Sequence, residues 1–182
     1  MVKLLCIIVN LESILNNLII DLSELKKYVD IQNKRLYDLS HYKEVLSKIK
    51  LLNFEDKSRV NDLIISVEKE ILLKAILEKH IVEVLSKAKT KGACLFLTSI
   101  FSREAIEYYL SNRGIESLID KIYDRRYGLE ECHRVKAVLE ENKIHVEEAV
   151  YIGVEDDIKK LGIFCLNPGE FFGGQVYESE IC

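Results

Sequence analysis

The sequence predicts an α/β fold: a Rossmann-like parallel sheet of about five strands with helices on both faces, plus an inserted all-helical cap. Three observations support this prediction. Short apolar runs typical of buried strands occur once near the start of the chain and again after Gly92. Apolar residues at helical spacing separate the later runs, and such alternation favours parallel strands. Between the first run and Gly92 lies a long segment that contains only helical patterns.

The first predicted strand covers residues 3–9, and the segment after it is predicted to be helical throughout. Leu18, Leu22 and Leu25 begin a helical spacing of apolar residues that continues as far as Leu85. This segment contains neither glycine nor proline. We therefore expect two parts, a core built from residues 1–15 and 86–182 and a helical cap inserted at residues 16–85.

After Gly92 the predicted elements alternate between strand and helix. Ser102 and Gly114 are residue types preferred at the start and the end of a helix, so they bound the first of these helices. The other predicted elements are strands at 93–99, 118–123, 149–153 and 163–167, a helix at about 130–142 and a short helix that ends at Gly162. Polar residues that follow such parallel strands are expected to meet in one crevice at the carboxyl edge of the sheet.

The composition is that of a globular protein with its own hydrophobic core. Hydrophobic residues make up 48% of the 182 residues, which is enough for a core without disulfides. The net charge of −4, with acidic and basic residues interspersed, argues against nucleic-acid binding. Ile, Leu, Glu and Lys are abundant, which fits a thermophile and equally an AT-rich genome.

Cysteine usage and the N-terminal residues favour a cytoplasmic location. The five cysteines form no C-x-x-C pair and their number is odd, so a reducing compartment is the simplest explanation. The apolar run before Asn10 is too short for a signal peptide, and no run approaches the roughly 20 apolar residues that span a bilayer. We expect a cytoplasmic protein without membrane contact.

Three stretches of sequence together resemble a known family. IIVNLESIL (7–15) is an apolar strand that ends in a polar turn, CLFLTS (94–99) is a strand that ends in hydroxyl residues, and YIGVEDDIKKLG (151–162) is a strand followed by acids. Their order resembles the motifs of the haloacid dehalogenase (HAD) superfamily, chiefly phosphatases. The resemblance covers residues 1–15 and about 85–168, and residues 16–85 fall where that family carries a helical cap.

The first stretch departs from the family at the position that matters most for catalysis. The resemblance places Asn10 where the family has its attacking aspartate and Glu12 where it has the acid that transfers protons. A carboxamide is a very poor nucleophile, so the covalent aspartyl-phosphate route is not open to Asn10. Ser13 and Ile14 also replace the usual Gly-Thr of the turn.

The other stretches imply groups that hold phosphate and metal. Thr98 and Ser99 match the phosphate-binding hydroxyl position of the family. The family's lysine is not evident, because the corresponding position falls near Glu131, so we take His133 and Arg134 as the phosphate-binding candidates. Val154 stands where the first acid of the last motif is expected. The residues implied as oxygen ligands of a weakened Mg²⁺ site are Asn10, Glu12, Asp156 and Asp157.

The leading functional hypothesis is a phosphatase-related protein with a degenerate site, weakly active or inactive, that binds a phosphorylated small molecule or a protein partner. One alternative is an active Mg²⁺-dependent phosphate-ester hydrolase that uses Glu12 with Asp156 or Asp157. A second alternative is a non-catalytic interaction protein whose cap is the binding surface. No nucleic-acid partner is expected.

Five of the candidate residues also have a purely structural explanation. Asn10 and Glu12 suit any polar turn at a strand end, and Thr98 could cap the following helix. Asp156 and Asp157 lie in the first turn of a predicted helix, where acids complement the helix dipole. A functional site therefore requires these side chains to lie close together in the folded chain.

Overall fold

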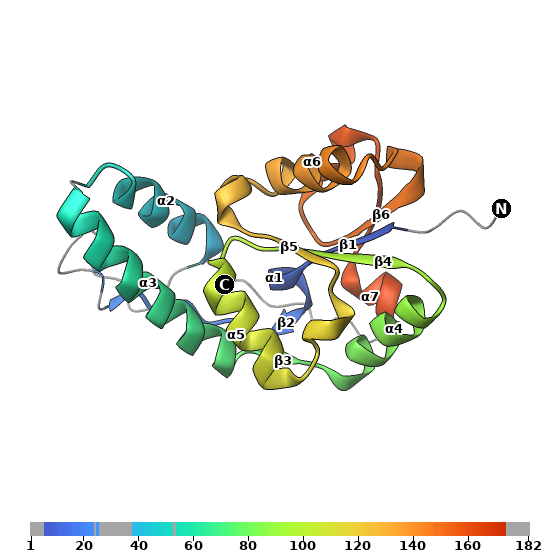
Figure 1. Ribbon diagram of the computed structural model, residues 1–182, viewed down its shortest axis with the longest axis horizontal. Helices are drawn as coiled ribbons and strands as arrows, with labels where there is room; N and C mark the ends of the chain where they lie inside the picture. The colour runs from blue at the N-terminus through green and yellow to red at the C-terminus, as the bar shows by residue number, and fades with distance from the viewer. Residues whose placement is uncertain (1–5, 24, 26–37, 53, 174–182) are drawn as a thin grey trace.

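The computed structural model describes residues 6–23, 25, 38–52 and 54–173. At its centre lies one sheet of five parallel strands in the order β5-β4-β1-β6-β7 (Figure 1). This arrangement confirms the predicted α/β class, although residues 3–5 of the first predicted strand lie outside the described residues. The strands are β1 (Cys6–Asn10), β4 (Cys94–Thr98), β5 (Lys121–Tyr123), β6 (Ala149–Ile152) and β7 (Phe164–Leu166).

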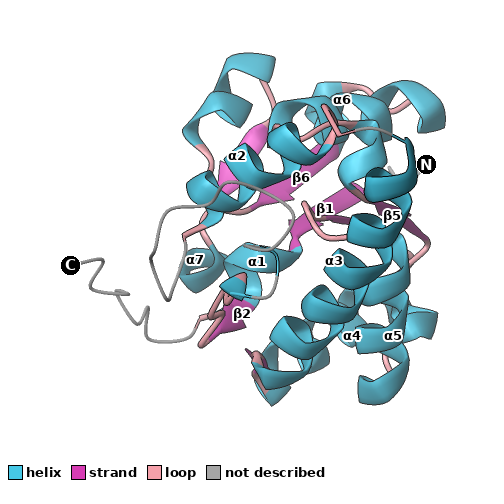
Figure 2. Cartoon of the chain, turned by 90° about the vertical axis from the view of Figure 1, so that its left-hand side faces the viewer, coloured by secondary structure: helices cyan, strands magenta, loops and turns pink. Residues whose placement is uncertain are grey.

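Helices cover both faces of this sheet (Figure 2). In Figure 1, α6 (Glu131–Asn142) lies on one face, and α4 (Lys79–Thr90), α5 (Arg103–Arg113) and α7 (Pro168–Phe172) lie on the other. Because side chains alternate along a strand, Ile7 and Val9 pack with the α5 side while Cys6 and Ile8 pack with the α6 side. A strand buried on both faces needs apolar residues at every position, which explains the unbroken apolar run of β1.

The predicted ends of the first core helix are correct. The Ser102 side chain accepts a hydrogen bond from the Ala105 N–H at the start of α5, and Gly114 ends the helix in the left-handed conformation. Similarly, Gly162 ends the short 3-10 helix η5 (Asp156–Leu161). Within the described ranges, no helix is both long enough and apolar enough to cross a membrane.

The strand predicted at 118–123 is shorter than expected. A 3-10 helix, η2 (Glu116–Leu118), occupies its start, and β5 begins only at Lys121. Asp120 explains the delay, because its N–H donates to the Leu95 carbonyl at 2.8 Å and its carboxylate accepts from the Leu95 N–H at 2.8 Å. Asp120 alone therefore satisfies both the N–H and the carbonyl of Leu95, which in a longer strand would pair with the β5 backbone.

The inserted segment contains two long helices and a short stem. The helices are α2 (Leu39–Ile49) and α3 (Phe54–Lys74), which stand to one side of the sheet (Figure 1). The stem is an antiparallel pair of two-residue strands, β2 (Leu15–Asn16) and β3 (Ile76–Leu77), that was not predicted, and residues 17–22, which were predicted to be helical, contain no helix. α4 starts before the expected boundary at residue 85 and contacts β4 and α7, so it lies against the sheet.

A buried carboxylate joins the cap helices to the core. Glu68 of α3 is 1% exposed and accepts hydrogen bonds from the Ser102 N–H at 3.0 Å and from the Ser102 hydroxyl. The Tyr42 hydroxyl of α2 and the Arg125 guanidinium of η3 (Arg125–Tyr127) also donate to it. We call Tyr42, Glu68, Ser102 and Arg125 the Glu68 cluster.

Candidate functional site at the strand tips

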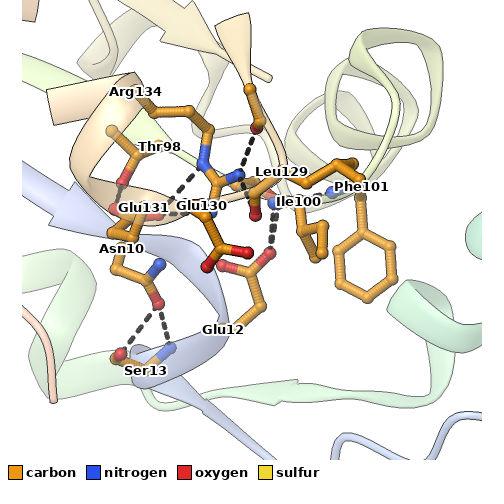
Figure 3. Close-up of polar contacts among 12 residues, drawn as sticks. Asn10, Glu12, Ser13, Thr98, Ile100, Phe101, Leu129, Glu130, Glu131 and Arg134 are labelled. Atoms are coloured by element: carbon orange, nitrogen blue, oxygen red, sulfur yellow. Dashed lines mark hydrogen bonds and ion pairs between the residues drawn. The ribbon is translucent and has the colours of Figure 1, made fainter. Parts of the chain in front are cut away.

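Asn10 is the last residue of β1 and caps the short helix α1 (Leu11–Ile14) that follows. Its side chain is buried, and its Oδ1 accepts from the Ser13 N–H at 2.8 Å and from the Ser13 hydroxyl at 2.7 Å (Figure 3). The residue at the expected nucleophile position therefore has the role of a helix N-cap. Asparagine suits that role because its amide oxygen satisfies an N–H that has no partner within the helix.

Glu12 connects the tip of β1 with the tip of β4. One carboxylate oxygen, Oε1, accepts from the Ser99 hydroxyl and from the Ile100 N–H, both at 2.7 Å. The other oxygen, Oε2, is buried and has no hydrogen-bond partner among the described residues. Burial raises the pKa of Glu12, and the neighbouring Glu131 adds to this effect while Arg134 and Ser99 oppose it. An acid in this setting holds its proton to higher pH than a surface glutamate does.

Thr98 lies beside Asn10, because the two are register partners on β4 and β1. The Thr98 side chain is fully buried, and its hydroxyl donates to the Glu131 carboxylate, with the Val9 carbonyl 3.4 Å away. The Ser99 hydroxyl, besides donating to Glu12, accepts from the Phe101 N–H at 3.1 Å. Each hydroxyl at the tip of β4 is therefore bound to a carboxylate of the protein itself.

Glu131 and Arg134 form a buried ion pair at the start of α6. The Arg134 Nε and Nη2 lie 3.0 and 2.6 Å from Glu131 Oε2, and the side chains are 3% and 1% exposed. Arg134 Nη1 donates to the carbonyls of Gly128 and Leu129 at 2.6 and 3.0 Å. Figure 3 shows this pair next to Asn10, Thr98 and Glu12. We call Asn10, Glu12, Thr98, Ser99, Glu131 and Arg134 the strand-tip cluster.

No family model and no curated protein matches the sequence. Solved structures do match the fold. A putative haloacid dehalogenase-like hydrolase from Bacteroides fragilis matches with a TM-score of 0.63 at 16% identity, over 90% of this chain and 86% of its own. CbbY from Rhodobacter sphaeroides, solved in complex with phosphate, matches with a TM-score of 0.60 at 16% identity, over 94% and 88% of the two chains. A haloacid dehalogenase-like hydrolase from Streptococcus pneumoniae matches at 0.58 and 14%, over 94% and 88%.

The chain has the haloacid dehalogenase fold. The shared fold agrees with the resemblance seen in the three sequence stretches, and two of the matches cover 94% of this chain. At 14–16% identity, these matches establish the HAD fold and leave the chemistry to be argued from the side chains.

Of the residues predicted at the HAD site, five meet at the strand tips: Asn10, Glu12, Thr98, Ser99 and Arg134. Glu131 contacts two of the predicted residues, Thr98 and Arg134, but was not itself predicted. An acid in the first turn of a helix looks like an ordinary complement to the helix dipole. A usable signal was the spacing of Glu131 and Arg134, three residues apart on the same helix face as the apolar Val135 and Val138.

Three other predicted residues lie outside the cluster. His133 is exposed and its side chain packs beside Gly128. The Asp156 side chain is 88% exposed and pairs with Lys159 at 2.8 Å. Asp157 is half-buried; burial raises the pKa of the Cys132 thiol, and the hydrogen bond that this thiol donates to Asp157 adds to the effect. Glu155, another acid of this segment, is electrostatically coupled to Glu131 and Arg134. Burial raises the pKa of Glu155.

Two of the four residues predicted as Mg²⁺ ligands, Asn10 and Asp156, are not placed to bind the ion. Asn10 Oδ1 already accepts two hydrogen bonds, Val154 offers no oxygen from its side chain, and Asp156 faces solvent. Across the described ranges, no group of three or more His, Cys, Asp or Glu side chains is placed to hold a metal ion. Arg134 instead supplies a fixed positive charge at the strand tips.

Proposed function

We propose that this chain is a HAD-fold protein with a degenerate phosphatase site that acts by binding, with little or no covalent phosphoryl transfer. The observation that carries the proposal is Asn10. A nucleophile for phosphorus needs a charged or activated atom, and the amide oxygen of Asn10 is neutral and accepts two hydrogen bonds from Ser13. The phosphate-binding positions Thr98 and Arg134 cannot replace the missing attacking group.

An active Mg²⁺-dependent hydrolase is the less favoured alternative. It would require Glu12 and an acid of the 156–157 segment to hold the ion together and to activate a water molecule. The surface position of Asp156 and its pairing with Lys159 count against this use of the segment. A binding role leaves two ligand classes, a phosphorylated small molecule and a protein partner.

Turnover of p-nitrophenyl phosphate, with and without Mg²⁺, tests the proposal. We expect the wild-type chain to release nitrophenol no faster than the Asn10→Ala variant purified in the same way. Comparing the two preparations corrects for contaminating phosphatases, because both carry the same background activity. Wild-type turnover well above that of Asn10→Ala, and lost in Glu12→Ala, would show that the chain is a hydrolase and refute the proposal.

A further inference from the structure

The Thr98 hydroxyl and the three guanidinium nitrogens of Arg134 each have a hydrogen-bond partner among the described residues. The Thr98 hydroxyl donates to Glu131, and the Arg134 Nε and Nη2 donate to the same carboxylate at 3.0 and 2.6 Å. The third guanidinium nitrogen, Nη1, donates to the carbonyls of Gly128 and Leu129. Glu131 thus occupies the position where an oxyanion would receive these donors (Figure 3).

Burial makes this internal contact hard to displace. Thr98, Glu131 and Arg134 are all buried, so a ligand that replaced the carboxylate would have to leave it without a partner inside the protein. An ionised carboxylate buried without a partner is far more costly than one that is paired.

We propose, as an extension of the binding role above, that Glu131 determines which ligands the strand tips accept. Its carboxylate fills an oxyanion position between the Thr98 hydroxyl and the Arg134 guanidinium, so the wild-type chain excludes phosphate there. A chain without this carboxylate binds phosphate at the same two groups. Glu131 is therefore a specificity-determining residue, and the ligand of the wild-type protein does not bring a phosphate group to the strand tips.

Binding of inorganic phosphate to purified variants tests this inference. Calorimetric titration at constant ionic strength should show no saturable binding to the wild-type chain. In Glu131→Ala, phosphate affinity should rise by about tenfold or more, because an internal competitor with a high effective concentration is gone. Phosphate, compared with chloride at the same ionic strength, should also raise the Tm of Glu131→Ala but not that of the wild type.

A second variant covers the case in which Glu131→Ala fails to fold. Glu131→Gln keeps the side-chain volume and removes the charge, and it should give a smaller gain in phosphate affinity, because the amide oxygen still competes for the same donors. The gain should disappear when Arg134→Met is added to Glu131→Gln. If neither Glu131 variant binds phosphate more tightly than the wild type, the inference is wrong.

Glu155→Ala is the matched control for general electrostatics. Glu155 is half-buried and is coupled to the same ion pair, but no hydrogen bond joins it to Thr98 or Arg134 among the described contacts. Its removal should leave phosphate affinity within about twofold of the wild type, since it holds no shared donor. An equal gain in Glu155→Ala and Glu131→Ala would mean that net charge alone excludes phosphate, which would also overturn the inference.

These results are independent of the turnover assay. Tight phosphate binding by the wild-type chain would contradict the inference about Glu131, whatever the rate of nitrophenol release. Conversely, turnover by the wild-type chain would contradict the proposed function, while the change in phosphate affinity on removing Glu131 would still be measurable.

Discussion

The Glu68 cluster and the strand-tip cluster are built from nearly the same chemistry in two different places. Each centres on a glutamate that is 1% exposed and receives hydrogen bonds from an arginine and from a serine or threonine hydroxyl. The first joins the inserted helices to the core and, among the described residues, has no buried polar side-chain atom without a hydrogen-bond partner. The second lies at the carboxyl edge of the sheet, and its Glu12 keeps one buried oxygen without a hydrogen bond.

This difference distinguishes a purely structural hydrogen-bond network from a candidate binding site. A buried carboxylate that receives all its hydrogen bonds can be explained by stability and specificity of packing alone. A buried polar atom without a partner costs free energy, so its presence needs another explanation, such as a ligand, water or a former catalytic role. The strand tips meet this second description, while the cap–core junction meets the first.

Removal of Glu68 should have the largest effect on stability. Glu68→Ala leaves the Arg125 charge and three other donor groups without their acceptor, so the free energy of unfolding should fall by about 4 kcal/mol. Urea denaturation followed by circular dichroism measures this change. Glu70→Ala, an exposed position on the same helix, is the control and should change stability by less than about 0.5 kcal/mol. Equal effects of the two variants would mean that the Glu68 cluster does not hold the cap in place.

Loss of Arg134 should lower the free energy of unfolding slightly less than loss of Glu68 does. Arg134→Met removes the cation beside buried Glu131 but keeps a side chain that fills the volume, and we expect a loss of about 3 kcal/mol. The double variant Arg134→Met, Glu131→Gln should recover part of this loss, because the uncompensated charge is then gone. Urea denaturation of the three proteins completes this comparison. A double variant less stable than Arg134→Met would show that unpaired charge is not the source of the cost.

The smallest effect concerns the pH dependence of stability. Burial raises the pKa of Glu12 above its ordinary value of 4.5, so the native state binds this proton more tightly than the unfolded chain does. The contribution of Glu12 to stability is therefore fully present below about pH 4.5 and is lost as the pH rises through its folded pKa. Glu12→Gln should gain stability relative to the wild type over that range. Parallel plots of unfolding free energy against pH for the two proteins would rule out a raised pKa at Glu12.

Much of the fold was readable from the sequence because its strands and core helices follow simple patterns. β1 is buried on both faces and therefore apolar at nearly every position, and α5 has a serine cap and a terminal glycine. β2 and β3 were not predicted, since two-residue strands are too short to carry a pattern. The expectation that polar residues after parallel strands meet at the carboxyl edge of the sheet is correct for Asn10 and Thr98, because adjacent parallel strands fix that pairing.

The polar contacts were less predictable. Glu68 lies on the apolar stripe of α3, four residues after Ile64 and three before Ile71, so the pattern contained a buried acid that helical periodicity alone does not explain. Its partners come from residues 26 to 57 positions away, and no local pattern specifies them. Asp156 shows the opposite error, since an acid after a strand looked like a ligand and instead forms a local pair on the surface.

The stem formed by β2 and β3 has a consequence for how this protein is built. The chain leaves the core at Leu15 and returns at Leu77, and these two residues are paired in register, with Asn16 also hydrogen-bonded to Glu78 at 2.6 Å. Everything between them begins and ends at one point in space. The stem therefore sets the distance that the core must bridge, whatever the length of the inserted helices, while the Glu68 cluster still ties α3 to the core.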